Sequence, residues 1–228
     1  MLRPLRTFNP LMLFGAAAAV AVILAATAIA DTVGAPATFR LAHLSPDAPA
    51  LDIYVDGVLH DSGLQFGQVG PTRSNGRNGP MVVAARLAGT SPESLPLISA
   101  EVNLHPGTAY VVAVANVLTH LQVGAYAIAT GDLSPGFARV QVLHAAPNAP
   151  RVGVRADREV IASGLGYLED PVYLDVPPGE ARVIGFTAET PTTLLFDHTR
   201  TLEAGTVEMV IVIGPPYDGI FLTARPGS

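Results

Sequence analysis

Cysteine, lysine and tryptophan do not occur anywhere in the 228-residue chain. The absence of cysteine excludes disulfides, thiolate metal sites and the acylated cysteine of a lipoprotein. The absence of lysine excludes Schiff-base chemistry and lysine–asparagine isopeptide crosslinks. With no tryptophan and only six tyrosines, the chain also offers little material for an aromatic platform that stacks on sugars.

Charged residues are scarce as well, at 14% of the chain against 49% hydrophobic residues. Glycine and proline are frequent, with 22 and 20 copies, and this composition favours an all-β architecture because exposed helices normally need many charges. The net charge of −6, without any basic stripe, excludes nucleic acid as a partner. No nucleophile elbow, zinc-protease motif or phosphate-binding loop occurs, so we expect no catalytic residue, no metal and no cofactor.

The first 30 residues have the pattern of an export signal. Arg3 and Arg6 precede an uncharged apolar run at residues 11–30, and small alanines near its end supply cleavage sites. The alternative is an uncleaved signal anchor, since about 20 apolar residues just span a bilayer. In either case we expect the protein to be secreted or at the cell surface, with membrane contact only through residues 11–30 if they are retained.

An internal repeat organises the rest of the chain. The segment His43–Pro49 recurs as His144–Pro150, and Leu104–Thr108 recurs as Leu202–Thr206. Two matching blocks in the same order indicate a duplication. The expected domains are residues 1–30 as the export signal or anchor, 38–130 as the first repeat and 138–226 as the second.

Short strands are predicted along both copies. Residues 51–55 alternate between apolar and polar side chains, and Asp56–Gly57 is a typical two-residue hairpin turn. The runs 109–115 and 207–213 are apolar on nearly every position, which predicts central strands. Later strands are expected at 81–87, 97–104, 108–116 and 121–129 in the first copy, and at 172–176, 181–186, 193–202, 206–213 and 220–224 in the second. The predicted fold is all-β, with two tandem immunoglobulin-like or transthyretin-like β-sandwich domains after an N-terminal signal or anchor helix.

The segment His43–Gly57, which reads HLSPDAPALDIYVDG, resembles the signature of the domain of unknown function 4397 family, found in exported bacterial and archaeal proteins. Members often carry the domain as a tandem pair, and the resemblance covers about residues 38–224. The second copy keeps the histidine and prolines of the motif but has Asn148 for the aspartate and Arg158 for the glycine. The resemblance implies export and a β-rich fold, and the family has no established activity.

His43 and His144 are the first candidate site residues, because each precedes a proline-rich turn at the end of a predicted strand. A metal-binding or catalytic role is one interpretation. The position favours a structural role, in which the ring hydrogen-bonds a neighbouring carbonyl or carboxylate and holds the turn. The predicted structural turn motif comprises His43, Pro46, Asp47 and Pro49, together with His144, Pro147, Asn148 and Pro150.

Asp47, Asp52 and Asp56 could supply oxygen ligands to calcium. The second copy has Asn148 and Gly153 at the first two of these positions, and the spacing fits no known calcium loop. Roles in a turn and a hairpin explain Asp47 and Asp56 without a metal.

The loop at residues 70–80 carries Arg73 and Arg77 among glycines and asparagines. Exposed loops often carry function, so these two arginines are a possible interaction site for an acidic polymer or partner. The alternative is a tolerated insertion in a hairpin, without a ligand.

We therefore expect no enzyme but an exported cell-envelope or extracellular module that serves interaction or structural spacing. Its partner would be an envelope or extracellular protein or a polysaccharide. The alternative is a secreted hydrolase or an accessory carbohydrate-binding protein, which a pocket holding two carboxylates, or a histidine beside a carboxylate, would favour.

Export predicts a defined N-terminus for the mature protein. Because the apolar run is rich in alanine and ends in small residues, mass spectrometry of the protein from its native source should show a chain that begins near Asp31. An intact Met1 in a fraction that needs detergent would show a retained signal anchor instead.

Overall fold

The structure is a computed structural model that describes residues 35–74, 76 and 79–226. The predicted export signal at residues 1–30 and Arg77 of the predicted interaction loop lie outside the described residues. Contacts gather Val33–Ser228 into one compact unit. Within the described ranges, no helix has both the length and the apolar character needed to cross a membrane.

Strands make up the regular structure of the described residues, apart from one short 3₁₀ helix, η1 (Leu118–His120), and the all-β prediction is confirmed. The first copy contains β1 (Thr38–Leu44), β2 (Leu51–Val55), β3 (Val58–Leu64), β4 (Gly79–Leu87), β5 (Ile98–Leu104), β6 (Ala109–Ala115) and β7 (Gln122–Ile128). The second copy contains β8 (Ala138–His144), β9 (Val152–Ala156), β10 (Glu159–Leu165), β11 (Val172–Val176), β12 (Gly179–Thr187), β13 (Leu194–Leu202), β14 (Val207–Ile213) and β15 (Asp218–Ala224).

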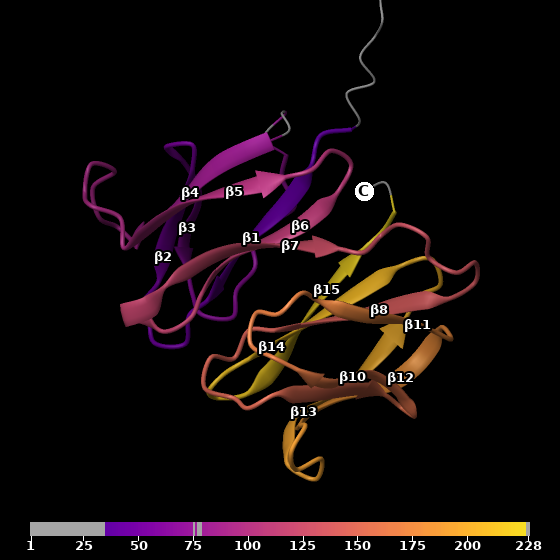
Figure 1. The fold of residues 1–228 in the computed structure, drawn as a ribbon. Helices are drawn as coiled ribbons and strands as arrows, with labels where there is room; N and C mark the ends of the chain where they lie inside the picture. The colour runs from indigo at the N-terminus through magenta and orange to yellow at the C-terminus, as the bar shows by residue number, and fades with distance from the viewer. Residues whose placement is uncertain (1–34, 75, 77–78, 227–228) are drawn as a thin grey trace, which may run out of the picture. The chain divides into compact units, whose positions relative to one another are not determined.

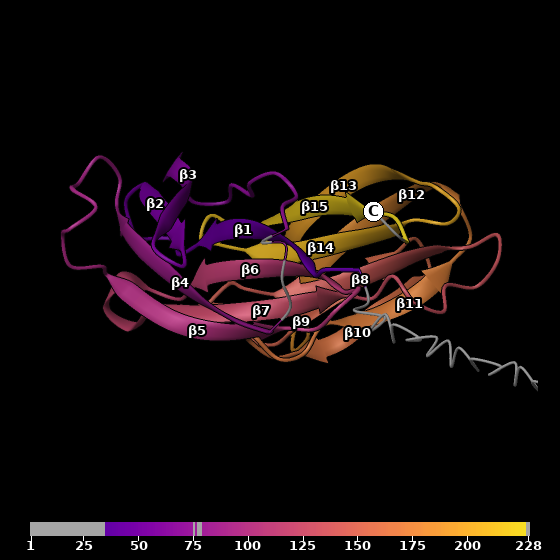
Figure 2. The same cartoon turned by 90° about the horizontal axis from the view of Figure 1, so that it is seen from above.

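Each copy forms a β-sandwich-like half from two sheets (Figure 1). The sheet orders are β3-β2-β4-β5 and β1-β6-β7 in the first copy, and β10-β9-β12-β13 and β11-β8-β14-β15 in the second. β1 runs parallel to β6 and β8 runs parallel to β14, whereas the other neighbouring strands are antiparallel. Figure 2 shows β6 between β1 and β7. The two apolar runs of the sequence, β6 and β14, are therefore central strands, as predicted.

The β2–β3 hairpin shows how closely the two copies agree. It turns at Asp56 and Gly57, whose φ angles of 49° and 81° lie in the left-handed region that a two-residue turn requires. The carboxylate of Asp56 accepts the backbone N–H of Val82 at 2.9 Å. In the second copy Asp157, with a φ of 50°, accepts the N–H of Arg182 at the same distance. Each turn is thereby tied to the next strand of its sheet.

The copies differ at one sheet edge. In the second copy β11 pairs with β8 along five residues. Among the described residues of the first copy, two isolated bridges, Phe39 to Arg73 and Ala42 to Val69, cover the equivalent edge of β1. The loop that carries Arg73 thus stands where the second copy has a full strand.

Three apolar clusters hold the fold together. One lies between the two sheets of the first copy, around Phe39, Leu41 and Ile53, and another lies between the sheets of the second copy. The third takes residues from both copies. Its buried members are Ala42, Leu44, Val111, Ala113, Ala115 and Ile128 from the first copy, with Leu143, Ala145, Val207, Met209, Ile211, Ile213 and Leu222 from the second.

This shared cluster explains why β6 and β14 are apolar on both faces. One face of each strand packs into the core of its own half, and the other packs into the shared cluster. The members correspond between copies: Ala42 matches Leu143, and Ala113 matches Ile211. The two copies therefore meet through equivalent faces, as the subunits of a two-fold symmetric dimer do.

We expect the two copies to unfold together, because separating them exposes the shared cluster to water. Replacing Ile211, which is fully buried there, with alanine should lower the free energy of unfolding by about 2–5 kcal/mol. The control Val160→Ala, at a position 53% exposed, should change it by less than about 0.5 kcal/mol. Calorimetry of the full chain provides the check, and two separate transitions in the unmodified protein would contradict the expectation.

Candidate functional site

The two motif histidines occupy matching, fully buried positions at the ends of β1 and β8. Nε2 of His43 lies 3.0 Å from the carbonyl oxygen of Pro49, and Nε2 of His144 lies 3.2 Å from that of Pro150. Nδ1 of each ring accepts a backbone N–H at 3.3 Å, from Ser45 in the first copy and from the matching residue in the second. Because Nδ1 accepts, the proton sits on Nε2 and is donated to the carbonyl.

These contacts satisfy the backbone of a turn that is rich in proline. Because prolines supply no N–H, few backbone donors are left within the turn, and the buried ring of the histidine provides one for a turn carbonyl. An aromatic ring also packs edge-on against each histidine, Phe66 at 6.5 Å from His43 and Tyr167 at 6.0 Å from His144. Burial lowers the pKa of both histidines, against smaller opposing effects of the backbone hydrogen bonds. Both rings are therefore neutral at pH 7 and hold their turns as neutral donors.

The rest of the predicted turn motif differs between the copies. The Asp47 carboxylate accepts the N–H of Leu118 at 2.7 Å, which ties the first turn to η1. In the second copy the backbone carbonyl of Asn148 accepts the hydroxyl of Tyr217 at 3.3 Å. The same turn is thus tied to the body of its half by different contacts.

The three aspartates considered for calcium bind different backbone segments. Asp52 is buried and accepts hydrogen bonds from Ser62 Oγ and Gly63 N, both at 2.8 Å, and from Gly89 N at 2.9 Å. Burial opposes ionisation, but these three donors together hold the pKa of Asp52 below its usual value. Across the described ranges, no group of three histidine, cysteine or acidic side chains is placed to hold a metal.

Arg73 of the predicted interaction loop is tied to the fold. Its guanidinium donates to both carboxylate oxygens of Asp61 on β3, at 2.9 and 3.0 Å, and to the carbonyl of His60 at 2.6 Å. Gly70 allows this approach, since a Cβ there would lie 2.4 Å from Asp61 Oδ2. Arg73 therefore fastens the loop to the first copy.

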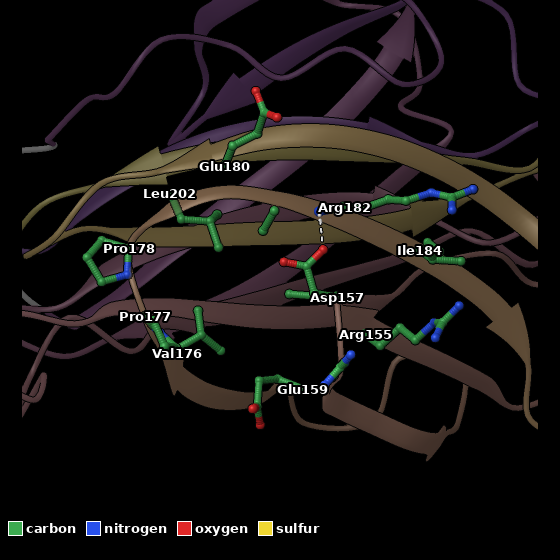
Figure 3. A pocket seen from close by; sticks show the side chains of 13 residues that line it. Arg155, Asp157, Glu159, Val176, Pro177, Pro178, Glu180, Arg182, Ile184 and Leu202 are labelled. Carbon is green, nitrogen blue, oxygen red and sulfur yellow. Dashed lines mark hydrogen bonds between the residues drawn. The ribbon is translucent and has the colours of Figure 1, made fainter.

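A hollow of about 640 Å³ lies on the second copy, at the β9–β10 turn and the start of β12 (Figure 3). Both charged and apolar residues line this hollow. The lining residues are Arg155, Ala156, Asp157, Arg158, Glu159, Val176, Pro177, Pro178, Glu180, Ala181, Arg182, Ile184 and Leu202. None of these residues was a predicted site residue.

The arginines of the hollow differ in their partners. Arg182 on β12 forms a two-pronged ion pair with Asp197 on β13, with Nε 2.8 Å from Oδ1. Its guanidinium holds the pKa of Asp197 below the usual value, with a smaller effect from Arg155. Within the described part of the chain, the side chains of Arg155 and Arg158 form no hydrogen bond or ion pair, and both are exposed.

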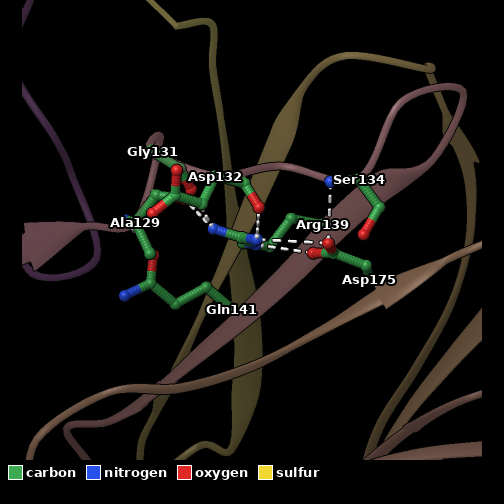
Figure 4. Close-up of polar contacts among 7 residues, drawn as sticks. All are labelled: Ala129, Gly131, Asp132, Ser134, Arg139, Gln141 and Asp175. Atoms are coloured by element: carbon green, nitrogen blue, oxygen red, sulfur yellow. Dashed lines mark hydrogen bonds and ion pairs between the residues drawn. The ribbon is translucent and has the colours of Figure 1, made fainter.

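A second polar cluster surrounds Arg139, which is 3% exposed, at the start of β8 (Figure 4). Nε and Nη2 donate to the carboxylate of Asp175 on β11, and the carbonyls of Ala129, Gly131 and Asp132 accept the remaining hydrogen bonds at 2.7–3.0 Å. The guanidinium lowers the pKa of Asp175 to about 2. Arg139 thereby fastens the connection between the copies to the second half.

Gln141, two residues further along β8, continues this attachment. Its side-chain amide donates to the carbonyl of Ala127 at 2.8 Å, and its carbonyl accepts the N–H of Ala129 at 2.9 Å. The end of β7 is therefore held by a side chain of the second copy.

The buried acidic, arginine and histidine side chains of the described ranges all have partners within the fold. Glu208, which is 4% exposed, accepts hydrogen bonds from Arg200 at 2.9 Å and from the hydroxyl of Thr223 at 2.7 Å. The other buried ionisable side chains, described above, are His43, Asp52, Asp61, Arg139 and His144. His198 also lies beside a carboxylate, with Nε2 2.7 Å from Oδ1 of Asp218. This pair is largely exposed and does not line the hollow.

The family described as a domain of unknown function (DUF4397) matches residues 37–155 and again residues 138–224. The chain belongs to this family. The two matches confirm the resemblance seen in the repeated motif, as a tandem pair of the domain. No curated protein matches the chain.

Among solved structures, the DUF4397 pair is similar to one described under α-glucan recognition by family 41 carbohydrate-binding modules from streptococcal virulence factors. The sequences are 10% identical, and the match covers 78% of this chain and 94% of the other. The TM-score is 0.28, so the likeness carries no argument about fold or function.

The buried histidines predict an acid-sensitive stability for the DUF4397 pair. Their folded-state pKa lies below the ordinary value of 6.5, so as the pH falls below about 6.5 the unfolded state binds protons that the folded state does not, and stability decreases. In the double variant His43→Gln, His144→Gln, this decrease between pH 7 and pH 5 should be smaller. The pKa of His60 is also lowered, so part of the decrease should remain.

Urea unfolding at several pH values measures this effect. At pH 8, each His→Gln change should also cost about 1–3 kcal/mol, because the turn loses its hydrogen bonds. The exposed His120 provides the control, and His120→Gln should leave the stability at pH 8 unchanged. An unchanged pH dependence in the double variant would contradict the assignment of neutral buried histidines.

Proposed function

We propose that this DUF4397 pair is a non-catalytic, exported module of the cell envelope or extracellular space that holds a partner in the hollow of its second copy. Export is supported by the charged and apolar pattern of residues 1–30. The module would be secreted, or tethered at the cell surface if that segment is retained.

One observation carries the non-catalytic part of the proposal. The ionisable groups that are buried in the described ranges are occupied by contacts that hold turns, strands and the connection between the copies. Catalytic acids and bases usually owe their function to burial in a site that is open to substrate. The charged groups of the hollow are exposed to water and suit binding rather than proton transfer. Glu208, a buried acid that lines another opening, is held by Arg200 and Thr223.

We also propose that the two halves are β-sandwiches of a specific kind. Seven strands in the first half and eight in the second, counted over the described residues, support sandwiches of the immunoglobulin-like or transthyretin-like kind. In such domains the loops and turns at the ends of the sheets are the usual binding surfaces, and the hollow includes two such turns.

A secreted hydrolase is the second candidate, because the carboxylates of Asp157, Glu159 and Glu180 line one hollow. Asp157 already serves the fold through its hydrogen bond to the N–H of Arg182, as Asp56 does in the first copy. Glu159 and Glu180 are exposed, which leaves no buried acid to protonate a leaving group. Release of reducing ends from a polysaccharide by the unmodified protein, abolished in Glu180→Gln, would establish the hydrolase instead.

The absence of cysteine makes the binding site directly testable. In Glu159→Cys, a thiol-directed photo-crosslinker would sit at one place only, in the hollow, and should capture a partner from the cell envelope or culture medium of the source cells. Val58→Cys is the matched control, since Val58 follows the same turn in the first copy and is also exposed. Excess unlabelled protein should compete away the capture at position 159. Equal capture from both positions, or none, would contradict a partner site in the hollow.

A further inference from the structure

The first copy provides an internal comparison for the hollow. Arg155 pairs with Ile184 across β9 and β12, and Tyr54 pairs with Ala84 at the same place in the first copy. In the hairpin turns, Arg158 follows Asp157, and Gly57 follows Asp56 in the first copy. Arg182 corresponds to Val82, because the backbone N–H of each donates to the aspartate of its own hairpin turn. The same strand register thus forms with tyrosine and valine in place of two of the arginines, while the turn backbone differs, because Gly57 has a positive φ and Arg158 does not.

The fold therefore does not require these three arginines. The side chains of two of them, Arg155 and Arg158, form no hydrogen bond or ion pair with the described residues, as noted above. Arg155 and Arg182 lie on neighbouring strands at diagonal positions, which places their Cβ atoms roughly 7–8 Å apart. Figure 3 shows both side chains extending to the same side of the hollow, with Ile184 between them. Arg182 is already paired with Asp197, so of these two guanidinium groups Arg155 is the one left to bind an external anionic group.

We infer that the hollow of the second copy binds an acidic polysaccharide whose carboxylates occur at intervals along the chain, with Arg155 and Arg158 as the residues that recognise a carboxylate. This inference rests on the proposed function and names the ligand of the same site. A guanidinium binds a carboxylate through two parallel hydrogen bonds, which gives both strength and orientation.

The lining favours a polysaccharide over a protein partner. Six of its thirteen residues are charged and none is aromatic, whereas the centres of protein–protein interfaces are depleted in charge and enriched in aromatic residues. Hydroxyl groups of sugars both donate and accept hydrogen bonds, so they can pair with arginines and carboxylates alike. The apolar wall formed by Val176, Pro177 and Leu202 can cover the nonpolar face of a sugar ring.

The acids of the hollow limit how densely the ligand is charged. Glu159 and Glu180 point away from Arg155 and Arg182 in Figure 3, so the charges are distributed unevenly around the opening. A polymer with a negative charge on every unit would be repelled by these two carboxylates and by the net charge of −6 on the chain. A polymer with one carboxylate every few sugars can place it on the arginines and its hydroxyls on the acids.

Affinity electrophoresis and calorimetry with defined polymers test the inference on the full chain. The probes are hyaluronan and partly esterified pectin, which carry carboxylates at intervals, with neutral dextran and polyglutamate as comparisons. Hyaluronan or pectin should bind, dextran should not, and added salt should weaken binding. Arg155→Gln and Arg158→Gly should each weaken binding about tenfold or more, since each removes a charge-assisted contact.

Glycine can adopt the backbone conformation of Arg158, and the first copy has glycine at the matching place in its turn, so the variant Arg158→Gly should still fold. Arg225→Gly removes an exposed arginine elsewhere and should change the affinity less than twofold. Failure of both acidic polysaccharides to bind, binding that Arg158→Gly leaves unchanged, or tighter binding of polyglutamate would each overturn the inference. If crosslinking from position 159 still captures a partner, the proposed function stands and only the ligand class is wrong.

Discussion

The apolar cluster that both copies share is the constraint on which the rest of this structure depends. A sheet buries one face in its own sandwich, and a second apolar face would be exposed unless something covered it. Here the outer faces of the sheets that contain β6 and β14 cover one another. Neither copy presents the surface of an independent domain, and the duplication is a structural requirement of each half. The polar contacts of Arg139 and Gln141 reinforce this arrangement at the connection.

Much of the strand pattern could be predicted from the sequence, because period-two alternation and turn residues are local signals. The expected strand at 172–176 is β11 as observed, and 194–202 in β13 differs from the expected 193–202 by one residue. The repeated histidine–proline motif marked two equivalent turns, and the structure places both histidines in matching contacts with a proline carbonyl. These features depend on residues close together in the chain.

The features that sequence reasoning missed depend on distant residues. The apolar runs at 109–115 and 207–213 indicated burial on both faces, but nothing local shows that the second face of one run packs with that of the other. Arg139 reaches Asp175, 36 residues away, and no spacing rule connects them. The hollow did leave a signal, since Arg155, Arg158 and Arg182 replace tyrosine, glycine and valine of the first copy. Comparing the copies for differences, and not only for matches, would have found it.

The covalent link between the copies changes what their pairing allows. In a symmetric dimer of separate chains, any new side chain appears on both subunits, and the two binding sites are the same. When the two copies are joined in one chain, equivalent positions can carry different residues while the shared interface stays intact. The hairpin turn with glycine in one copy and arginine in the other is such a difference, so the two halves pack like the subunits of a homodimer while their outer surfaces differ.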